Sequence, residues 1–293
     1  MEQSKYKISV IIPTYNRLHE LVLTLNSLCN QTLSLDQYEV IVCDDGSKTD
    51  TLSIVKRYEE KINIKYCYHP DKGFRVATTR NLGIKVAQGD VCVFIDNGIL
   101  VSSKALENHY ESHIHPKCAV VGYVYGFDDL NSHYDDVKDI TDKNDVDVAI
   151  KKLQQLNIRD SREIVYEELG DEINGYPAPW VLCWSGNVSV KRSFLFDVGL
   201  FDESYSSWGG EDNDLALALY TNGAEFILNR NSSSIHYPHE KLHNIITNPK
   251  KAEEELLEKQ EYLFKKYPLD TLKQWFSINE LELNQYLVKK GDV

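Results

Sequence analysis

The chain has 293 residues, of which 42% are apolar, and a formal net charge of −13. This length suits one large α/β domain or two small ones, and the apolar content is sufficient for a sizeable core. The sequence contains no dense block of Lys and Arg, which argues against duplex nucleic acid as a partner. An anionic ligand would have to be bound locally, by a few cations, backbone N–H groups or a metal.

The sequence also bears on location. The N-terminal segment over residues 1–7 is short and polar and lacks the apolar region of a signal peptide. No stretch reaches the roughly 18 apolar residues that a transmembrane helix needs. None of the six cysteines has C-x-x-C spacing. We therefore expect a protein of the reducing cytoplasm, without a transmembrane segment.

Short apolar runs alternate with helical patterns through the first half of the chain. The runs predict strands over residues 8–12, 38–43, 62–68, 90–96 and 119–125. Helices are predicted between them, over residues 17–28, from a cap at Thr49 or Asp50 to about residue 60, and over residues 76–88 and 103–113. This alternation predicts an α/β fold with a Rossmann-like, doubly wound and mostly parallel sheet.

The second half is less regular. Residues 128–174 are rich in Asp and Lys, with a helical pattern over 146–156. A possible insertion or lid over 128–175 is one interpretation of this composition, and a solvated helical face is the other. The remaining elements are predicted as helices over 191–198 and 211–222, strands over 224–228 and 234–237, and amphipathic helices over 251–265 and 277–289. We expect a main domain over residues 1–245 and a C-terminal helical extension over 246–293.

Polar residues follow three of the predicted strands. They occupy residues 13–17, 44–47 and 96–98. Ligands of doubly wound sheets bind beyond the carboxyl ends of the strands, so these loops are predicted to share one binding rim. The alternative is that Asp, Asn and Gly stand there only because turns favour them.

The segment Trp208-Gly209-Gly210-Glu211-Asp212 precedes a run of strong helix formers. Two glycines and an acidic first turn predict a flexible loop that enters a helix, where the backbone can approach a ligand closely. A carboxylate there could act as a general base on a hydroxyl group. The alternative is that these acids only complement the helix dipole.

Together these motifs resemble family-2-type inverting glycosyltransferases with the GT-A fold. The resemblance rests on their order along the chain, which begins with the loops at 13–17 and 44–47. The segment over 73–83 looks like the entrance of the donor-binding helix, and Asp96-Asn97-Gly98 stands at the place of an Asp-x-Asp metal motif. The Gly-Gly-Glu-Asp segment is similar to the acceptor-side motif of chondroitin polymerases and β-1,4-galactosyltransferases. The resemblance covers about residues 6–240.

The resemblance implies a nucleotide-sugar donor, most often a UDP-sugar. Asp45 would bond the uracil edge, and Asp44 would lie near the ribose. The other residues implied in donor binding are Pro13, Tyr15, Arg17, Arg80, Asp96 and Asn97. For the two aspartates, an ordinary Asx-turn with a helix cap is the alternative. Arg80 could equally be an ordinary surface arginine of a helix.

The resemblance also implies Mn²⁺ or Mg²⁺ at the diphosphate, held by Asp96 and His236. The histidine nitrogen suits Mn²⁺ better than Mg²⁺. The chain departs from the family pattern at Gly98, where the second acid of the motif is missing. His236 could also be an ordinary interior histidine, and His239 and His243 follow it closely.

On the acceptor side the resemblance implies Asp212 as the catalytic base, with Glu211 holding the acceptor or the donor sugar. Trp208 could stack on a sugar face beside Gly209 and Gly210, or it could serve only in core packing. The segment Ser185-Gly186-Asn187, directly after Trp184, resembles the small-residue segment that lines the acceptor site, so Trp184 and Ser185 are implied in acceptor binding.

The sequence therefore predicts a UDP-sugar-dependent glycosyltransferase of the hexosyltransferase type. Its acceptor could be a glycan, a lipid-linked sugar, a peptide or a small molecule. A non-catalytic nucleotide-sugar-binding scaffold in a glycan assembly complex is the alternative, and the Gly98 substitution favours it. Nucleotidyl transfer is disfavoured because no glycine-rich, lysine-bearing phosphate loop follows the first strand.

Overall fold

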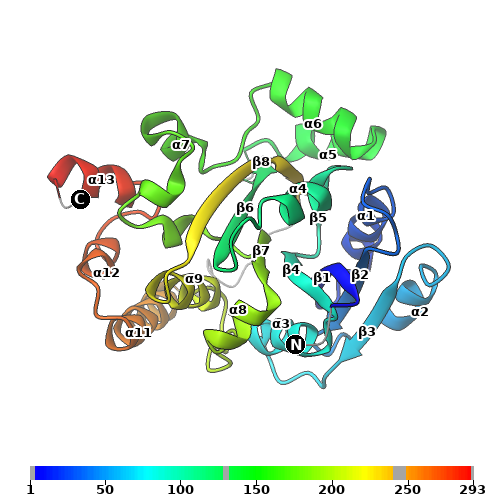
Figure 1. Cartoon of the computed structure of the whole chain (residues 1–293), viewed down its shortest axis with the longest axis horizontal. Coiled ribbons are helices and arrows are strands. Elements are labelled where there is room, and N and C mark those ends of the chain that lie inside the picture. Colours follow the sequence, from blue (N-terminus) through cyan, green and yellow to red (C-terminus); the bar gives the residue numbers. More distant parts are fainter. Residues whose placement is uncertain (1–3, 128–131, 240–248, 292–293) are drawn as a thin grey trace.

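A computed structural model describes residues 4–127, 132–239 and 249–291, with side chains from residue 254 onward in the last range. Among these residues, eight strands form one sheet in the order β3-β2-β1-β4-β7-β6-β8-β5 (Figure 1). Their bounds are β1 (Tyr6–Thr14), β2 (Tyr38–Asp44), β3 (Ile64–Tyr68), β4 (Gly89–Ile95), β5 (Ile99–Val101), β6 (Cys118–Tyr125), β7 (Asn187–Lys191) and β8 (Glu225–His236).

Helices pack on both faces of this sheet. They are α1 (Leu18–Leu28), α2 (Thr51–Lys56), α3 (Val76–Val86), α4 (Ala105–Glu111), α5 (Tyr134–Lys143), α6 (Val146–Gln155), α7 (Glu163–Leu169), α8 (Arg192–Asp197), α9 (Glu211–Thr221), α11 (Pro249–Lys266), α12 (Asp270–Trp275) and α13 (Leu283–Lys290). Two short 3₁₀ helices, η1 (Ile173–Gly175) and η2 (Pro179–Leu182), precede β7.

The two faces follow from the alternation of side chains along each strand. In β1, Val10 joins the cluster that contains Leu21 of α1, whereas Ile11 joins the cluster that contains Ile84 of α3. The strand β1 pairs in parallel with β2 and β4, and β2 pairs in parallel with β3. The pairings of β4 with β7, β6 with β7 and β5 with β8 are antiparallel, whereas β6 and β8 run parallel. The predicted doubly wound, mostly parallel sheet is confirmed.

One prediction about the sheet is wrong. The strands expected over 224–228 and 234–237 are a single strand, β8. Its polar middle suggested a loop, but β6 and β8 stay paired through an irregularity between Gly122 and Val124. There the buried side chain of Asn187 donates to the Ser232 carbonyl oxygen at 2.9 Å, which satisfies a polar group inside the sheet.

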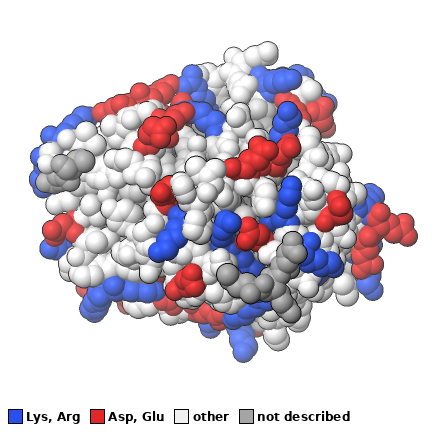
Figure 2. All heavy atoms as spheres, viewed as in Figure 1, with Lys and Arg blue, Asp and Glu red and all other residues white. Residues whose placement is uncertain are grey.

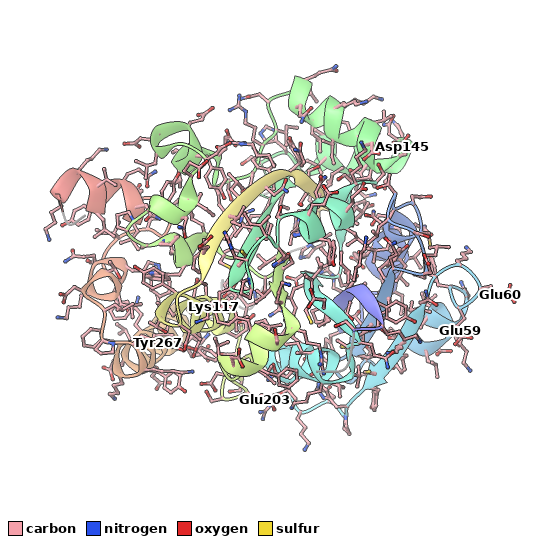
Figure 3. The ribbon with its side chains drawn as sticks, in the orientation of Figure 1. Glu59, Glu60, Lys117, Asp145, Glu203 and Tyr267 are labelled. Atoms are coloured by element: carbon pink, nitrogen blue, oxygen red, sulfur yellow. The ribbon has the colours of Figure 1, made fainter. Side chains whose placement is uncertain are left out.

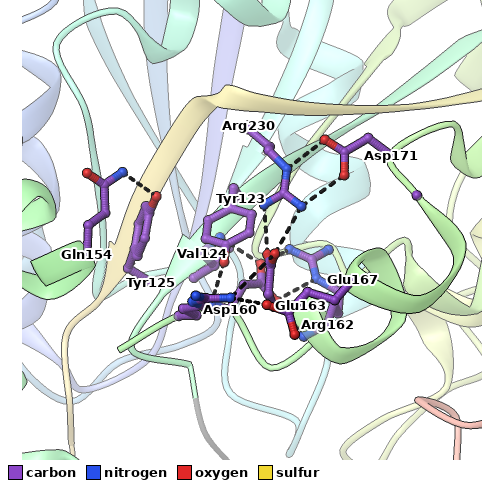
Figure 4. Close-up of polar contacts among 12 residues, drawn as sticks. Tyr123, Val124, Tyr125, Gln154, Asp160, Arg162, Glu163, Glu167, Asp171 and Arg230 are labelled. Atoms are coloured by element: carbon purple, nitrogen blue, oxygen red, sulfur yellow. Dashed lines mark hydrogen bonds and ion pairs between the residues drawn. The ribbon is translucent and has the colours of Figure 1, made fainter. Parts of the chain in front are cut away.

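Residues 132–175 form α5, α6, α7 and η1, and polar contacts attach them to the sheet (Figure 4). Arg162 Nη2 lies 2.6 Å from Asp160 Oδ2, and both side chains are almost fully buried. The same carboxylate accepts from the Val124 N–H of β6 at 2.8 Å. Arg230 of β8 binds Glu163 at 2.7 Å. That this segment moves as a lid stays a prediction.

The C-terminal helices share the core of the main fold. Leu263, Leu272 and Leu287 belong to the same buried cluster as the residues of α3 and α9. The Asn284 side chain bonds both the N–H and the carbonyl oxygen of Ala178. The prediction of a helix over 277–289 is wrong for residues 277–282, because α13 begins only at Leu283. The domain division at residue 245 stays a prediction.

Two surface properties bear on partners. On the face drawn in Figure 2, acidic and basic side chains are interspersed, without an extended basic patch. None of the helices in the described ranges combines the length and the apolar character that crossing a bilayer requires.

Candidate active site

The three predicted polar loops do share one rim. The Asp45 N–H donates to the Thr14 carbonyl oxygen at 2.9 Å, which joins the ends of β1 and β2. The Asn97 side chain, beyond β4, donates to Thr14 Oγ1 at 2.6 Å. Asn16 adds a contact that the sequence did not single out, since its Oδ1 accepts from the Lys48 N–H at 2.7 Å. Because parallel strands end at the same edge, segments far apart in sequence meet here.

Asp44 and Asp45 have different roles in this rim. Asp44 Oδ1 accepts from the Ser47 N–H at 2.7 Å, and its Oδ2 accepts from Tyr66 Oη at 2.8 Å. Both oxygens are therefore used inside the protein, as in the Asx-turn alternative. Asp45 Oδ2 accepts from the Arg75 N–H at 3.0 Å. Its Oδ1 makes no hydrogen bond with any described residue, although His69 Nε2 lies 3.2 Å away.

Asp45 is 8% exposed, and burial raises the pKa of its carboxyl group. The Arg75 N–H and the His69 charge lower that pKa, but their effect is smaller. The loop that carries His69 also closes over the turn. A Cβ on Gly46, which has φ of +85°, would lie 2.2 Å from the Asp71 nitrogen, so only glycine fits there. Asp71 in turn accepts from Tyr15 Oη at 3.0 Å. Asp45 is thus a buried acceptor whose Oδ1 makes no hydrogen bond with any described residue.

Two other predicted donor residues lie on β1 and at its end. Pro13 is buried in β1 and stands opposite Cys43 in the register. Arg17 caps the start of α1, and its Nη2 lies 3.5 Å from Glu20 Oε1. Both belong to the rim, and Arg17 keeps part of its guanidinium exposed.

Arg80 connects Asp96, at the rim, with Glu211, at the start of α9. It extends from α3 and is 3% exposed. Its Nη2 donates to Asp96 Oδ1 at 2.8 Å, and its Nη1 donates to Glu211 Oε1 at 2.9 Å. Burial alone would lower the pKa of Arg80, but the two carboxylates outweigh it and raise that pKa above its ordinary value. The alternative of an ordinary surface arginine is excluded by this geometry.

The loop before α9 has the conformation that its glycines permit. Gly209 and Gly210 have φ of +86° and +96°, and a Cβ on Gly210 would lie 2.8 Å from Tyr205 Cε1. Trp208, just before them, is 70% exposed and therefore does not serve in core packing. The loop thus presents a bare indole face at the entrance to α9.

The three acids in the first turn of α9 differ in their surroundings. Glu211 binds Arg80, and its Oε2 has no hydrogen bond with any described residue. Asp214 is 2% exposed and accepts from Lys266 and Tyr267 of the C-terminal segment. Asp212 Oδ1 accepts from the N–H of its neighbour Asn213 at 2.8 Å, and the residue is partly exposed. Of the three, Asp212 has the carboxylate best placed to receive a proton.

The pKa of Asp212 matches that role. Burial raises the pKa of its carboxyl group to about 7, and the Glu211 charge adds to the effect. Arg80 and the Asn213 N–H act in the opposite direction, and Glu280 adds a smaller rise. A carboxylate whose pKa lies near neutrality is well matched to general-base catalysis, because it is both ionised and basic at working pH.

Trp184 and Ser185 lie beside these residues on the segment before β7. Trp184 Nε1 donates to the Val181 carbonyl oxygen at 3.0 Å, and its ring packs 5.0 Å above the buried Arg162 guanidinium. Ser185 is 6% exposed. The Asp212 charge raises the pKa of the Cys183 thiol, which places this segment near Asp212.

The predicted metal ligands come from neighbouring elements. His236, in β8, is paired with Ile99, and the next N–H, that of Tyr237, donates to the Gly98 carbonyl oxygen at 2.8 Å. The His236 ring packs against Phe127 and His239, both with centroids 5.1 Å away. His243 lies outside the described residues. Asp96 is 43% exposed.

These two donors suit a divalent ion only in part. An oxygen and an imidazole nitrogen match Mn²⁺, but no group of three or more metal-type side chains occurs among the residues with described placement. Gly98 has φ of +102°, a conformation in which an aspartate would be strained. The residues present therefore fit an ion that takes its remaining ligands from a bound anion and water.

Comparison with known proteins agrees with this geometry. The family model for glycosyl transferase family 2 matches residues 9–167, and that for the N-terminal domain of galactosyltransferase matches residues 170–243. The first match covers the donor rim, and the second covers the segment from Trp184 to His236. The fold and site thus define a glycosyltransferase with the GT-A fold. The chain belongs to glycosyl transferase family 2.

Two relatives illustrate the range of the family. The chain is 34% identical over 239 residues to validoxylamine A glucosyltransferase of Streptomyces hygroscopicus subsp. jinggangensis, covering 80% of this chain and 56% of that protein. It is 31% identical over 230 residues to chondroitin synthase of Escherichia coli, covering 75% of this chain and 33% of that protein. The chain thus spans about half or less of the length of these relatives.

Two solved structures share the fold. S. aureus TarS in complex with UDP-GlcNAc has a TM-score of 0.61 at 20% identity, over 87% of this chain and 65% of that one. The mannosyltransferase PcManGT from Pyrobaculum calidifontis, in complex with GDP-Man and Mn²⁺, has a TM-score of 0.59 at 16% identity, over 98% and 75% of the two chains.

Proposed function

We propose that this glycosyltransferase moves a hexosyl group from a UDP-sugar to an acceptor hydroxyl group, with inversion at the anomeric carbon. The observation that carries the proposal is the position of Asp212, a carboxylate with a pKa near neutrality, beside a buried Arg80 that reaches the donor rim. The TarS structure with UDP-GlcNAc supports a UDP-sugar, because the two proteins share their fold.

On the donor side, Asp45 would accept the N3–H of uracil through Oδ1, which makes no hydrogen bond with any described residue, near the hydrogen-bonded pair Tyr15 and Asp71. Asp44 would act indirectly, since its oxygens hold the turn that presents Asp45. Arg80 would hold both Asp96 and Glu211 in place beside the sugar. Pro13, Arg17 and Asn97 would shape the rest of the rim.

In the reaction, the Asp212 carboxylate would take the proton of the acceptor hydroxyl group. The acceptor oxygen would then form a bond to the anomeric carbon, and the bond from that carbon to the diphosphate oxygen would break, with its electron pair leaving on UDP. Asp96 and His236 would hold a divalent ion, Mn²⁺ or Mg²⁺, whose charge would neutralise the leaving diphosphate.

The acceptor would bind on the side of Trp208 and Trp184. An exposed indole at the entrance to α9 offers an apolar face to a sugar ring. The names of the relatives, a glucosyltransferase of validoxylamine A and a chondroitin synthase, support either a small molecule or a glycan as acceptor. A lipid-linked sugar or a peptide stays open as well. We also propose that the protein is located in the cytoplasm.

Release of UDP from a panel of UDP-sugars, with water as acceptor, tests the proposal. The wild-type chain should release UDP from at least one sugar, and Asp212→Asn should reduce the rate by about a hundredfold or more, as expected for loss of a general base. The affinity of the variant for UDP should stay within about twofold, because Asp212 lies on the acceptor side. Full activity of the variant would refute the assignment of the base.

The same assay addresses the alternative function. Gly98, which removes one carboxylate from the metal motif, favours a non-catalytic nucleotide-sugar-binding scaffold. Such a scaffold would bind UDP without releasing it from any sugar, and the Asp212→Asn substitution would then change nothing. Binding of UDP without turnover in the wild-type chain would therefore decide for the scaffold.

A further inference from the structure

The loop over residues 202–210 carries the exposed Trp208 and leads into the candidate base, yet it contains no regular secondary structure. Two consecutive glycines at positive φ allow its backbone many conformations in the absence of other restraints. Holding Trp208 and Asp212 in a productive arrangement therefore requires contacts from outside the loop.

Helix α11 makes these contacts. Lys259 Nζ donates to the Trp208 carbonyl oxygen at 2.6 Å. Lys266 Nζ lies 2.8 Å from Asp202 Oδ2 at the beginning of the loop and 2.8 Å from Asp214 Oδ1 just after its end. The helix α11 therefore contacts the loop at its first residue and at its exposed tryptophan, and it also contacts the first turn of α9.

The side chains that contact the loop and α9 share one face of α11. Positions 259, 262, 263, 266 and 267 follow the spacing of three and four residues that places side chains on one stripe. Tyr262 Oη donates to Asp202 Oδ2 at 2.5 Å, and Tyr267 Oη, labelled in Figure 3, donates to Asp214 Oδ1 at 2.8 Å. Leu263, between them, is 1% exposed. The whole stripe faces the acceptor side of the active site.

The charges along this face are matched to the loop. Burial would raise the pKa of Asp202, but the hydrogen bonds from Lys266 and Tyr262 outweigh it and hold that pKa well below its ordinary value. Burial lowers the pKa of Lys259, whereas the charges of Glu255 and Glu211 raise it. Lys259 thus also acts electrostatically on Glu211, the carboxylate that binds Arg80.

We infer that α11 is part of the acceptor-binding site, with Lys259 as the positioning residue that fixes the Trp208 backbone. The helix lies beyond both segments that match family models, which end at residue 243. The inference rests on the proposed function in one respect, since it takes the 202–210 loop as the acceptor side. Lys259 acts through the loop, because its ammonium group is already bound to a carbonyl oxygen.

Amide hydrogen exchange of residues 203–209 tests this inference without an acceptor. Lys259→Met removes the donor to Trp208 and should speed exchange in the loop by about tenfold, as expected when one restraining hydrogen bond is lost. Lys265→Met is the matched control, because Lys265 is on the same helix, is 78% exposed and pairs only weakly with Glu261 at 3.9 Å. Lys259→Arg keeps a donor and should restore much of the protection.

Further measurements separate a local effect from unfolding and from the donor site. The urea midpoint of Lys259→Met should stay close to that of Lys265→Met, and its affinity for UDP should stay within about twofold of the wild type. Acrylamide quenching of Trp208, taken as the difference from a Trp208→Phe chain, should increase in Lys259→Met.

Exchange in the loop equal to that of the wild type would overturn the inference. An equal acceleration throughout the chain would overturn it as well, because the role of Lys259 would then be general stability. Absence of UDP release by the wild-type chain would refute the proposed function and leave this test intact.

Discussion

Replacing Asp212 by Asn should make the folded chain more stable at alkaline pH, although it removes the candidate base. The pKa of this carboxyl group rises from an ordinary 3.8 to about 7 in the folded protein, mainly through burial. The folded state therefore holds the proton more tightly than the unfolded chain does. The free energy of unfolding must fall as pH rises from about 4 to about 7 and then level off.

The magnitude follows from the two pKa values. Their difference corresponds to about 4 kcal/mol at ~1.4 kcal/mol per pH unit, and the solvent contact of Asp212 reduces the expected effect to about 2–4 kcal/mol. Asparagine has nearly the same shape and no charge, so Asp212→Asn escapes this cost. At pH 8 the free energy of unfolding of the variant should exceed that of the wild type by about 2–4 kcal/mol. At pH 5 this difference should be smaller by roughly 2 kcal/mol.

Urea unfolding at pH 5, 6, 7 and 8 measures the effect, and Asp202→Asn serves as the matched control. Hydrogen bonds from Lys266 and Tyr262 hold the pKa of Asp202 below its ordinary value, so its stabilisation is present above pH ~4 and is lost only in acid. The control should therefore be destabilised by about 1–3 kcal/mol to the same extent at pH 5 and pH 8. A stability difference between Asp212→Asn and the wild type that is the same at pH 5 and pH 8 would refute the reasoning.

Two further predictions concern the donor side. Asp45→Ala should weaken UDP binding by about tenfold or more, because it removes the acceptor proposed for the uracil N–H. The control Asp50→Asn, at the exposed cap of α2, should leave the affinity for UDP unchanged. If calorimetry finds an unaltered affinity in both variants, uracil recognition by Asp45 is excluded. Mn²⁺ should bind weakly alone and more tightly with UDP, and each should tighten the other by the same factor, since Gly98 offers no carboxylate beside the two proposed ligands Asp96 and His236. Titration of Mn²⁺ with and without UDP measures this, and equal affinities in both cases would contradict the assignment.

The strands and their polar ends could be predicted from the sequence because their signals are local. The apolar run of β2 and the turn that begins at Asp44 lie within ten residues of each other, and the parallel sheet then brings such turns to one edge. The single long strand β8 escaped prediction because its serines and asparagines are typical of a loop. The serines are buried, and two of them bond Asn187, which is distant in sequence.

The different roles of the acids in α9 could not be predicted. Glu211, Asp212 and Asp214 have similar chemistry and stand within one helical turn, so nothing local distinguishes them. Arg80, 131 positions before Glu211, and Lys266, 52 positions after Asp214, determine which acid is paired. The sequence predicted an amphipathic helix over 251–265, which ends one residue before Lys266, and it gave no sign of the surface that the helix would cover.

The arrangement around Arg80 also gives a physical role to the missing acid at position 98. Asp96, Glu211 and Asp212 already place three carboxyl groups near a single buried cation, and a fourth beside the diphosphate site would increase the repulsion that an anionic donor meets. Glycine at 98 would lower that repulsion and would at the same time weaken the proposed metal site in the free protein. The donor would then bring part of the coordination shell with it, so that metal binding would depend on nucleotide binding. On this argument Gly98 is compatible with the proposed catalysis, because a metal would be bound when there is a diphosphate charge to neutralise.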